Sequence, residues 1–374
     1  MPSSTITLAP RTTTTCERLV TALDTVLDPR SRRGRRFELV AVLALAVTAV
    51  VAGAQSFAAI GQWAAEATAE ELAAFGFGRH GAPGESTLRK LFARLDATKL
   101  DAVIGAWMFT RTTIVSGRRV IAIDGKTVRG ARTRKTTAPH LVSAFDTGAS
   151  VVLGQLQVDA KTNEVPTART LLSSMDITGA VITMDAMHTQ HDTAQAIIAA
   201  GGDYVFTVKG NTKTLLAELK SLPWKDIPAH RGTLVGHGAR ATRTIKVVDA
   251  PAWVEFHGAT QVAQLRRTVT RDGKRHVEVV YLITSADFTT APPAVLASWI
   301  RDHWHIENRL HWVRDVTFGE DASQVRTGNA PHVMATLRNT TIALLRLAGH
   351  TNLAEARRHH ARHPDHTTKL VMTS

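Results

Sequence analysis

Residues 120–131 read VIAIDGKTVRGA, an apolar run that ends on Asp124 and continues into polar and basic residues. This run opens a region in which short β-rich stretches are separated by helical patterns. The β-rich stretches are VIAID (120–124), HLVSAF (140–145), VVLGQLQV (151–158), VITMD (181–185) and YVFTV (204–208). Alternation of this kind predicts an α/β fold.

The regions on either side of these stretches have other patterns. Residues 1–119 show helical periodicity and little strand signal, which predicts an all-helical N-terminal domain. Residues 223–274 hold several Pro and Gly among alternating runs, and we interpret them as a β-rich insertion. The other expected segments are a strand at 277–284, helices at about 294–313 and 332–347, a domain boundary at 347, and a basic His- and Arg-rich tail at 348–374 without strong apolar order.

The composition points to an anionic partner. The chain has 374 residues, and its 45 Lys and Arg against 32 Asp and Glu give a formal net charge of +13. A hydrophobic content of 44% is enough to build ordinary buried cores. The single cysteine, Cys16, excludes an internal disulfide, and the first residues lack the pattern of a secretory leader. We therefore expect a cytoplasmic protein.

One stretch imitates a membrane span. Residues 39–54, LVAVLALAVTAVVAGA, are almost wholly apolar and approach the roughly 20 residues that a transmembrane helix needs. Ala dominates the stretch, Thr48 and Gly53 interrupt it, and another amphipathic helical pattern follows. We interpret it as a buried core helix and expect no membrane partner. The alternative, a membrane-associated protein, predicts recovery in the membrane fraction.

A dense basic cluster precedes this apolar stretch. The sequence DPRSRRGRR (28–36) is suited to contact a phosphate backbone, although a solvated basic turn is the alternative interpretation. Because the whole chain is basic, we favour nucleic acid. The candidate DNA-binding residues here are Arg30, Arg32, Arg33, Arg35 and Arg36.

Two acids end apolar strand runs in the same way. Asp124 ends VIAID and Asp185 ends VITMD, and ligands in α/β folds bind at the carboxyl ends of strands. Two such acids on neighbouring strands can share a divalent cation, and oxygen ligands favour Mg²⁺ or Mn²⁺. Several polar residues just beyond strand ends are candidates to bind the DNA backbone or, alternatively, are exposed loop residues: Lys126, Arg129, Lys209 and Asn211.

The segment WIRDHWHIENRLHWVRD (299–315) supplies a third acid, Glu307. If the segment is a regular helix, His303, Glu307, His311 and Arg314 lie along one face. Zinc held by His303, Glu307 and His311 is an alternative, but it lacks the HExxH order of a metalloprotease helix and leaves both strand acids without a role. Magnesium with oxygen ligands explains more of the residues.

Several strings together resemble the DDE transposases of bacterial insertion sequences, in particular the H-repeat-associated branch. The strings are AIDGKTVRGA (122–131), HLVSAF, TMDAMHTQ (183–190), DYVFTVKGN (203–211) and RDHWHIENRLHWVRDVTFGEDAS (301–323). DPRSRRGRR and the apolar stretch after it resemble the N-terminal associated domain of that branch. The resemblance runs from about Leu23 to Arg346 and implies an RNase H-like catalytic domain over 120–347 that includes the β-rich insertion.

The resemblance also implies a function and a set of catalytic residues. Asp124, Asp185 and Glu307 match the catalytic triad, which would hold two Mg²⁺ or Mn²⁺ ions. The expected activity is cleavage at the terminal inverted repeats of an element, followed by transfer of the freed 3′ end to target DNA. Double-stranded DNA and a second copy of the chain, as a homodimer in the synaptic complex, are the implied partners, and a nucleoid-associated location follows.

The resemblance departs from the wider group around the glutamate. Where that group has Tyr, Arg and Lys, this chain has Ile300, His303 and Arg314. His303 and Arg314 can still donate to phosphate, so they remain candidate DNA-binding residues. The alternative function is a catalytically inactive DNA-binding relic of a transposase, and the presence of all three acids weighs against it.

Overall fold

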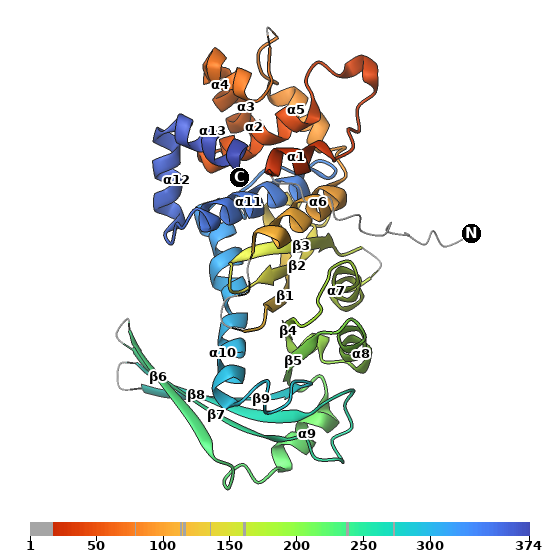
Figure 1. Cartoon of the computed structure of the whole chain (residues 1–374), viewed down its shortest axis with the longest axis vertical. Helices are drawn as coiled ribbons and strands as arrows, with labels where there is room; N and C mark the ends of the chain where they lie inside the picture. Colours follow the sequence, from red (N-terminus) through yellow and green to blue (C-terminus); the bar gives the residue numbers. More distant parts are fainter. Residues whose placement is uncertain are drawn as a thin grey trace, which may run out of the picture.

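A computed structural model describes residues 18–374 except 79, 113, 115–116, 135, 160–161, 237–238 and 272–273. Cys16 and the start of the expected N-terminal domain lie outside the described residues. Figure 1 shows an elongated molecule with a helical part at one end, a large sheet in the middle and a curved extension of that sheet at the other end.

Only helices occur among the described residues before position 112. They are α1 (Leu19–Asp24), η1 (Arg32–Gly34), α2 (Leu39–Val51), α3 (Phe57–Glu66), α4 (Ala69–Ala74), α5 (Glu85–Phe92) and α6 (Ala97–Arg111). Side-chain caps fix several of their starts. Thr68 and Glu71 form a reciprocal capping box at α4, and Asp96 accepts the N–H of Lys99 at 3.0 Å at α6.

The apolar stretch 39–54 forms α2, a core helix. Of its 13 residues, 12 are buried, and the helix packs against α1, α3, α11 (Ala330–Leu347) and α13 (Pro364–Thr373). Thr48 satisfies its hydroxyl within the helix by donating to the Ala44 carbonyl at 2.8 Å. Among the described residues, none of the helices combines the length and apolar character that crossing a membrane requires.

The C-terminal segment corrects our expectation of a tail without apolar order. Residues 348–374 contain α12 (Leu353–Arg362) and α13, which pack on the N-terminal helices. Leu353, Ala356 and Val371 are buried in the same core, and the Leu19 N–H donates to the Ser374 carbonyl oxygen at 2.6 Å. Apolar residues are sparse among the His and Arg of this segment, but they recur at helical spacing. The helical part is thus built from both ends of the chain (Figure 1).

The five predicted β-rich stretches form five neighbouring strands. These are β1 (Val120–Thr127), β2 (His140–Asp146), β3 (Val151–Gln157), β4 (Val181–Met184) and β5 (Asp203–Val208). In the order β3-β2-β1-β4-β5, the pairs β1–β4 and β4–β5 are parallel and the other two are antiparallel. The helices α7 (Glu164–Ser173) and α8 (His191–Ala199) cover one face of these strands, and α10 (Pro293–His303) lies on the other (Figure 1).

The predicted β-rich insertion consists of strands, and these continue the same sheet. After α9 (Lys213–Ser221), the chain forms β6 (Ala229–Gly236), β7 (Ala239–Asp249), β8 (Gln261–Arg271) and β9 (Lys274–Thr284). All neighbouring pairs among these strands are antiparallel, and β9 pairs with β5. The sheet therefore has nine strands, and β6–β9 form its curved end (Figure 1).

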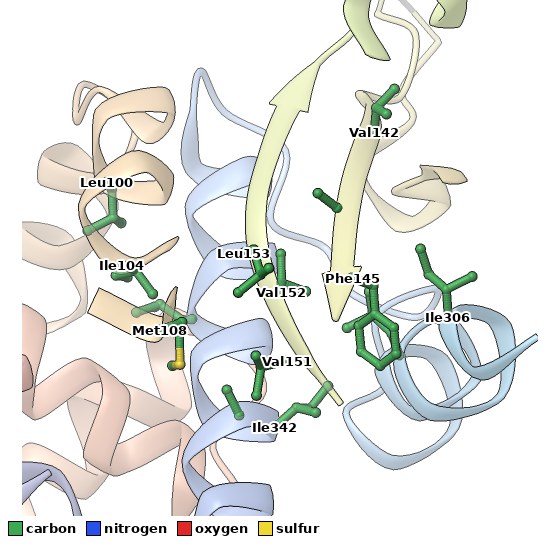
Figure 2. Close-up of a cluster of buried hydrophobic side chains, with 14 of the residues drawn as sticks. Leu100, Ile104, Met108, Val142, Phe145, Val151, Val152, Leu153, Ile306 and Ile342 are labelled. Carbon is green, nitrogen blue, oxygen red and sulfur yellow. The ribbon is translucent and has the colours of Figure 1, made fainter. Parts of the chain in front are cut away.

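The helical part docks closely on the edge strand β3. A Cβ added to Gly105 of α6 would lie 2.1 Å from the Leu153 carbonyl oxygen, so only glycine permits this approach. Figure 2 shows Leu100, Ile104 and Met108 of α6 facing β3, with Ile342 of α11 beside them. The core of the helices and the core of the sheet therefore form one continuous apolar cluster.

Candidate active site

The acids that end the two apolar runs, Asp124 and Asp185, lie side by side. β1 and β4 are parallel neighbours whose last paired residues are Ile123 and Met184. Asp124 and Asp185 are the next residues in the chain, so both carboxylates start from the same level of the sheet. Asp185 directly follows β4, but β1 continues past Asp124 to Thr127 in its pairing with β2, which corrects the expectation that Asp124 ends its strand. Asp185 begins the short turn η3 (Ala186–His188), and Asp124 accepts the Gly125 N–H at 2.9 Å. The predicted placement of two acids on neighbouring strands is confirmed.

The third acid lies on a helix of irregular pitch. We expected a regular helix over about 294–313, but α10 ends at His303 and is followed by two π-helical segments, η4 (Ile306–His311) and η5 (Val313–Thr317). The wider turns, with i to i+5 hydrogen bonds, change which side chains share a face. The predicted common stripe of His303, Glu307, His311 and Arg314 is therefore wrong for Arg314, whereas Glu307 and His311 still contact each other and His303 lines the same cleft as Glu307. His311 points towards the sheet, and Arg314 points into the protein interior.

His311 joins the acids from two different elements. Its Nδ1 lies 3.2 Å from Glu307 Oε2 and 3.5 Å from Asp124 Oδ2. Ligand atoms of Asp124, Glu307 and His311 all lie within 4.8 Å of one another, a spacing that can hold a metal ion. The His311 side chain is buried, and its Nε2 has no hydrogen-bond partner among the described residues. With its proton on Nδ1, the imidazole donates to Glu307 and lies beside Asp124.

The electrostatics of this cluster favour a cation. Burial, together with the nearby carboxylates of Glu164, Asp185 and Glu307, raises the pKa of Asp124 to about 7, against the lowering effect of the hydrogen bond from Gly125. The hydrogen bond with His311 lowers the pKa of Glu307. Burial also lowers the pKa of His311, so the imidazole tends to be neutral. The unbalanced negative charge and the oxygen donors fit a divalent metal ion.

A cleft of about 360 Å³ runs past these residues. Asp124, Asp185 and Glu307 all line it, and we call these three residues the acid wall. The cleft extends from the strand ends along α10 to the curved end of the sheet. Its charged and polar lining beyond the acid wall consists of Thr183, Thr207, Lys209, Arg243, Arg267, Glu278, Arg301 and His303.

Sequence reasoning missed a fourth carboxylate, Glu164. It accepts from His188 Nε2 at 3.0 Å and from His140 Nε2 at 2.8 Å, provided that each ring carries its proton there. Burial alone would raise the pKa of Glu164, but the hydrogen bonds and charges of the two histidines lower it to about 2. A Cβ at Gly125 would lie 2.4 Å from Glu164 Oε2, so Glu164 packs directly against the backbone that follows Asp124.

The arginine cluster at 30–36 divides into two groups. Arg30 donates to the Asp28 carboxylate and to the Phe37 carbonyl, and Arg35 donates to the backbone of the same turn and pairs with Asp28 at 3.3 Å. These contacts hold the turn before α2. The remaining candidates, Arg32, Arg33 and Arg36, are exposed.

The four candidates expected beyond strand ends also have different surroundings, and Lys126 lies within β1 instead. Lys126 is paired with Asp315 at 2.6 Å and is only 10% exposed, so it stabilises the packing of η5 on β1. Asn211 donates to the Ala186 carbonyl at 2.6 Å and holds the turn after Asp185. Arg129 is exposed near Asp321, and Lys209 is exposed and lines the cleft. Only Arg129 and Lys209 are well placed to meet a ligand from solvent.

The structure separates His303 from Arg314. His303 lines the cleft, where its Nδ1 lies 2.9 Å from the Thr183 hydroxyl, and burial lowers its pKa. Arg314 has no exposed surface and binds Glu320 at 2.7 Å. Its burial corrects the expectation that Arg314 contacts DNA. The three residues of the zinc alternative do not come together among the described residues, because His303 does not belong to the group of ligand atoms formed by Asp124, Glu307 and His311. Asp185 lies outside this group as well and is related to it by lining the same cleft.

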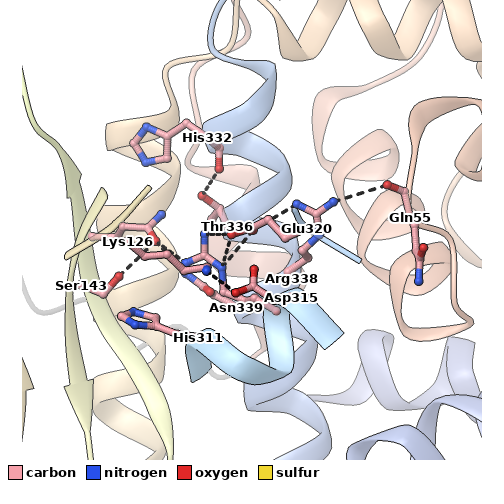
Figure 3. Close-up of polar contacts among 12 residues, drawn as sticks. Gln55, Lys126, Ser143, His311, Asp315, Glu320, His332, Thr336, Arg338 and Asn339 are labelled. Carbon is pink, nitrogen blue, oxygen red and sulfur yellow. Dashed lines mark hydrogen bonds and ion pairs between the residues drawn. The ribbon is translucent and has the colours of Figure 1, made fainter. Parts of the chain in front are cut away.

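Arg314 belongs to a buried polar network behind the acid wall. Glu320 accepts from both Arg314 and Arg338, and all three side chains are at most 1% exposed. Figure 3 shows Arg338 extending from α11 to Glu320 and to the Gln55 carbonyl. The network joins the segment that carries Glu307 to the helical part of the molecule.

Comparison with known proteins defines the class. The family model described as "Transposase DDE domain" matches residues 115–345, and the model "DDE_Tnp_1-associated" matches residues 20–108. The chain therefore belongs to the DDE transposase family.

Its relatives include the "H repeat-associated putative transposase YhhI" of Escherichia coli strain K12, which is 33% identical over 346 residues. That match covers 88% of this chain and 90% of YhhI. A second relative, "H repeat-associated putative transposase YbfD" of the same strain, is 32% identical over 63% of this chain and 95% of its own length. The resemblance to the H-repeat-associated branch is confirmed.

Among solved structures, a piggyBac transposase in a synaptic complex with hairpin DNA matches with a TM-score of 0.44 and 12% identity. The match covers 89% of this chain and 71% of the piggyBac chain. Similarity at this level carries no argument about the site.

Proposed function

We propose that this chain binds the terminal inverted repeats of an insertion sequence and catalyses metal-dependent cleavage and transfer of DNA strands. One observation carries the proposal: Asp124, Asp185 and Glu307, far apart in the sequence, line a single cleft. The arrangement of β1–β5 is the basis for assigning an RNase H-like core to this part of the sheet. The helices of residues 18–111 are assigned to a DNA-binding, associated domain.

The acid wall is the proposed metal site. Asp124, Asp185 and Glu307 would hold two Mg²⁺ or Mn²⁺ ions, as in two-metal phosphoryl transfer. When bound, the metal would activate a water or 3′-hydroxyl and stabilise the leaving 3′-oxygen. His311 positions Glu307 through Nδ1, which also lies 3.5 Å from Asp124. Oxygen donors from three carboxylates suit these ions better than zinc.

The exposed basic residues are proposed to bind DNA. Arg32, Arg33 and Arg36 on the helical part, and Arg129 and Lys209 near the strand ends, are exposed cations. His303 can donate to a phosphate in the cleft once its bond with Thr183 is exchanged. Contacts to phosphates position a protein on DNA without reading its sequence. Joining two element ends requires a second copy of the chain, so we propose a homodimer in the synaptic complex.

Three variants test the proposed function. Asp124→Asn, Asp185→Asn and Glu307→Gln each remove one acid while keeping the shape of the side chain. We expect each to abolish Mg²⁺-dependent cleavage of DNA taken from the flanks of the coding region, because no cation remains correctly held. Binding of the same DNA in a gel shift should persist.

The matched control is Asp192→Asn. Asp192 lies on α8, its side chain is 79% exposed, and it does not line the cleft. This variant should cleave as the wild-type chain does. Wild-type cleavage by all three acid-wall variants would refute the proposal. A wild-type chain that binds these ends without cleaving or joining them in Mg²⁺ or Mn²⁺ would favour the inactive DNA-binding relic instead.

A further inference from the structure

The cleft has a second charged region, which the proposed catalytic residues do not use. Arg243 on β7 and Arg267 on β8 line it together with Arg301 at the end of α10. Arg243 and Arg267 are directly opposite each other in the antiparallel pair, so both side chains project from the same face of the sheet. We call Arg243, Arg267 and Arg301 the arginine wall.

The charges of the arginine wall are incompletely balanced. Arg267 has Glu278 at 4.0 Å, and Arg301 has the neighbouring Asp302 at 3.6 Å. Arg243 has no ion pair among the described residues, and its Nη1 is buried without a hydrogen-bond partner. Like charges that face each other across a sheet are destabilising, and a guanidinium does not lose its proton in a protein. Such a cluster is favourable only when an anion occupies it.

Burial and the two neighbouring arginines both lower the pKa of Arg243. This direction agrees with the geometry, because each of these effects disfavours an unpaired positive charge. An anion between the three guanidinium groups would remove the repulsion and satisfy the buried Nη1. Guanidinium groups match the oxygens of a phosphate in pairs, which makes phosphate the best fit.

We propose that Arg243, supported by Arg267 and Arg301, binds a non-scissile backbone phosphate of the DNA strand whose reacting phosphate lies at the acid wall. The inference rests on the proposed function, and it gives the β-rich insertion a specific role. A DNA strand carries phosphates at regular intervals, so one strand can meet both walls of a single cleft. A phosphate at the arginine wall would fix the position of the strand along the cleft.

The first test measures DNA affinity without metal. The probe is a short fluorescent DNA duplex in EDTA, and its anisotropy is followed over a series of salt concentrations. We expect Arg243→Gln to bind about tenfold more weakly and to reduce the slope of log affinity against log salt by about one, as loss of one phosphate contact does. Wild-type affinity and slope for this variant would overturn the inference.

The matched control is Arg266→Gln. Arg266 precedes Arg267 on β8, is exposed and does not line the cleft. Successive residues of a strand project to opposite faces, so this variant removes the same charge from the other face. Its affinity and slope should remain close to wild type. Equal losses in Arg243→Gln and Arg266→Gln would also overturn the inference, because they would indicate a diffuse charge effect.

Two further measurements separate a loss of DNA binding from a loss of folding. Thermal unfolding of the free chain should show Arg243→Gln at least as stable as the wild type, because the variant relieves repulsion. If Arg243→Gln does not fold, Arg243→Lys keeps the charge but loses the paired hydrogen bonds. It should retain the salt slope and bind several-fold more weakly, and unchanged binding would overturn the inference.

The source of the phosphate is tested on the DNA itself. A neutral methylphosphonate is placed at successive positions along one strand of the DNA end used in the binding assay. One non-scissile position should weaken wild-type binding but have little further effect on Arg243→Gln, and the absence of such a position would overturn the inference. The methylphosphonate and Arg243→Gln are then coupled, because each removes the same contact. If the wild type never cleaves DNA and this coupling is still found, the phosphate site stands and the proposed function fails. If the wild type cleaves and no coupling is found, only the phosphate site fails.

Discussion

The acid wall and the arginine wall belong to one cleft but are built differently. The acid wall rests on buried strand ends, a buried histidine and the Arg314–Glu320–Arg338 network. The arginine wall stands on the curved end of the sheet, where the corresponding acid, Glu278, is 63% exposed. The carboxylates of the acid wall, which must keep a fixed geometry, are thus supported by buried side chains. The arginines of the arginine wall, which would meet a long charged ligand, remain open to solvent. The two Arg–Glu arrangements allow this contrast to be measured.

The largest expected effect on stability is in the network behind the acid wall. Glu320→Gln leaves two buried arginines without a full counter-charge, and the burial of both groups makes this costly. We expect the free energy of unfolding to fall by about 3–5 kcal/mol. Urea denaturation measures the change. A loss below about 1 kcal/mol would mean that the network does not support the acid wall.

The next effect concerns Glu164, whose folded-state pKa of about 2 lies below its ordinary value of 4.5. A lowered carboxyl pKa stabilises the folded state above about pH 4.5, and this contribution is lost as the pH falls towards 2. Glu164→Gln should therefore lose roughly 1.5–3 kcal/mol at neutral pH, because two hydrogen bonds to a charged group are weakened. Its stability should also depend less on pH between these two values. Parallel pH profiles for variant and wild type would contradict the assignment.

A smaller effect of opposite sign is expected at Asp124. Its folded-state pKa of about 7 lies above the ordinary 3.8, so the wild type loses stability as the pH rises from 3.8 to 7. Without metal at about pH 8, Asp124→Asn should be more stable than the wild type by roughly 1–2 kcal/mol, a value reduced for the partial exposure of the carboxyl. The difference should vanish below the ordinary pKa. Thermal unfolding at both pH values measures it, and a less stable variant at high pH would contradict the burial argument.

The smallest effect is expected at the arginine wall. Glu278→Gln removes an exposed partner that lies 4.0 Å from Arg267. Exposed ion pairs of this kind contribute little, so unfolding should change by less than about 1 kcal/mol. Urea denaturation of Glu278→Gln and Glu320→Gln under the same conditions compares the two losses of unfolding free energy directly. Similar losses in the two variants would remove the distinction between a supported wall and an open one.

The sequence predicted those parts of the molecule in which the pattern of apolar residues along a short segment is enough to determine where that segment is buried. Apolar runs that end in Asp124 and Asp185 became parallel neighbours, because strands with this pattern are buried on both faces. The burial of α2 followed from its composition in the same way. The segment that carries Glu307 stood out by its polar residues at helical spacing, but the match of Glu307 to a catalytic triad depended on the resemblance.

Other features depend on contacts that no local pattern records. The π-helical turns at η4 and η5 arise where the chain packs on β1 and α11, and they turn Arg314 towards Glu320. Glu164 follows Asn163 at the start of α7, where an acid is expected from the helix dipole alone. Arg243 lies in an alternating strand, and its burial depends on α10 and on the pairing with β8.

The most direct test of the acid wall is a titration of the purified chain with Mn²⁺, followed by electron paramagnetic resonance of the free ion. The wild type should bind Mn²⁺, Asp192→Asn should bind it equally well, and Asp124→Asn should lose at least one site, because the carboxylate shared by the cluster is gone. If Asp124→Asn binds Mn²⁺ with the same stoichiometry and affinity as the wild type, the assignment of the acid wall as the metal site is contradicted.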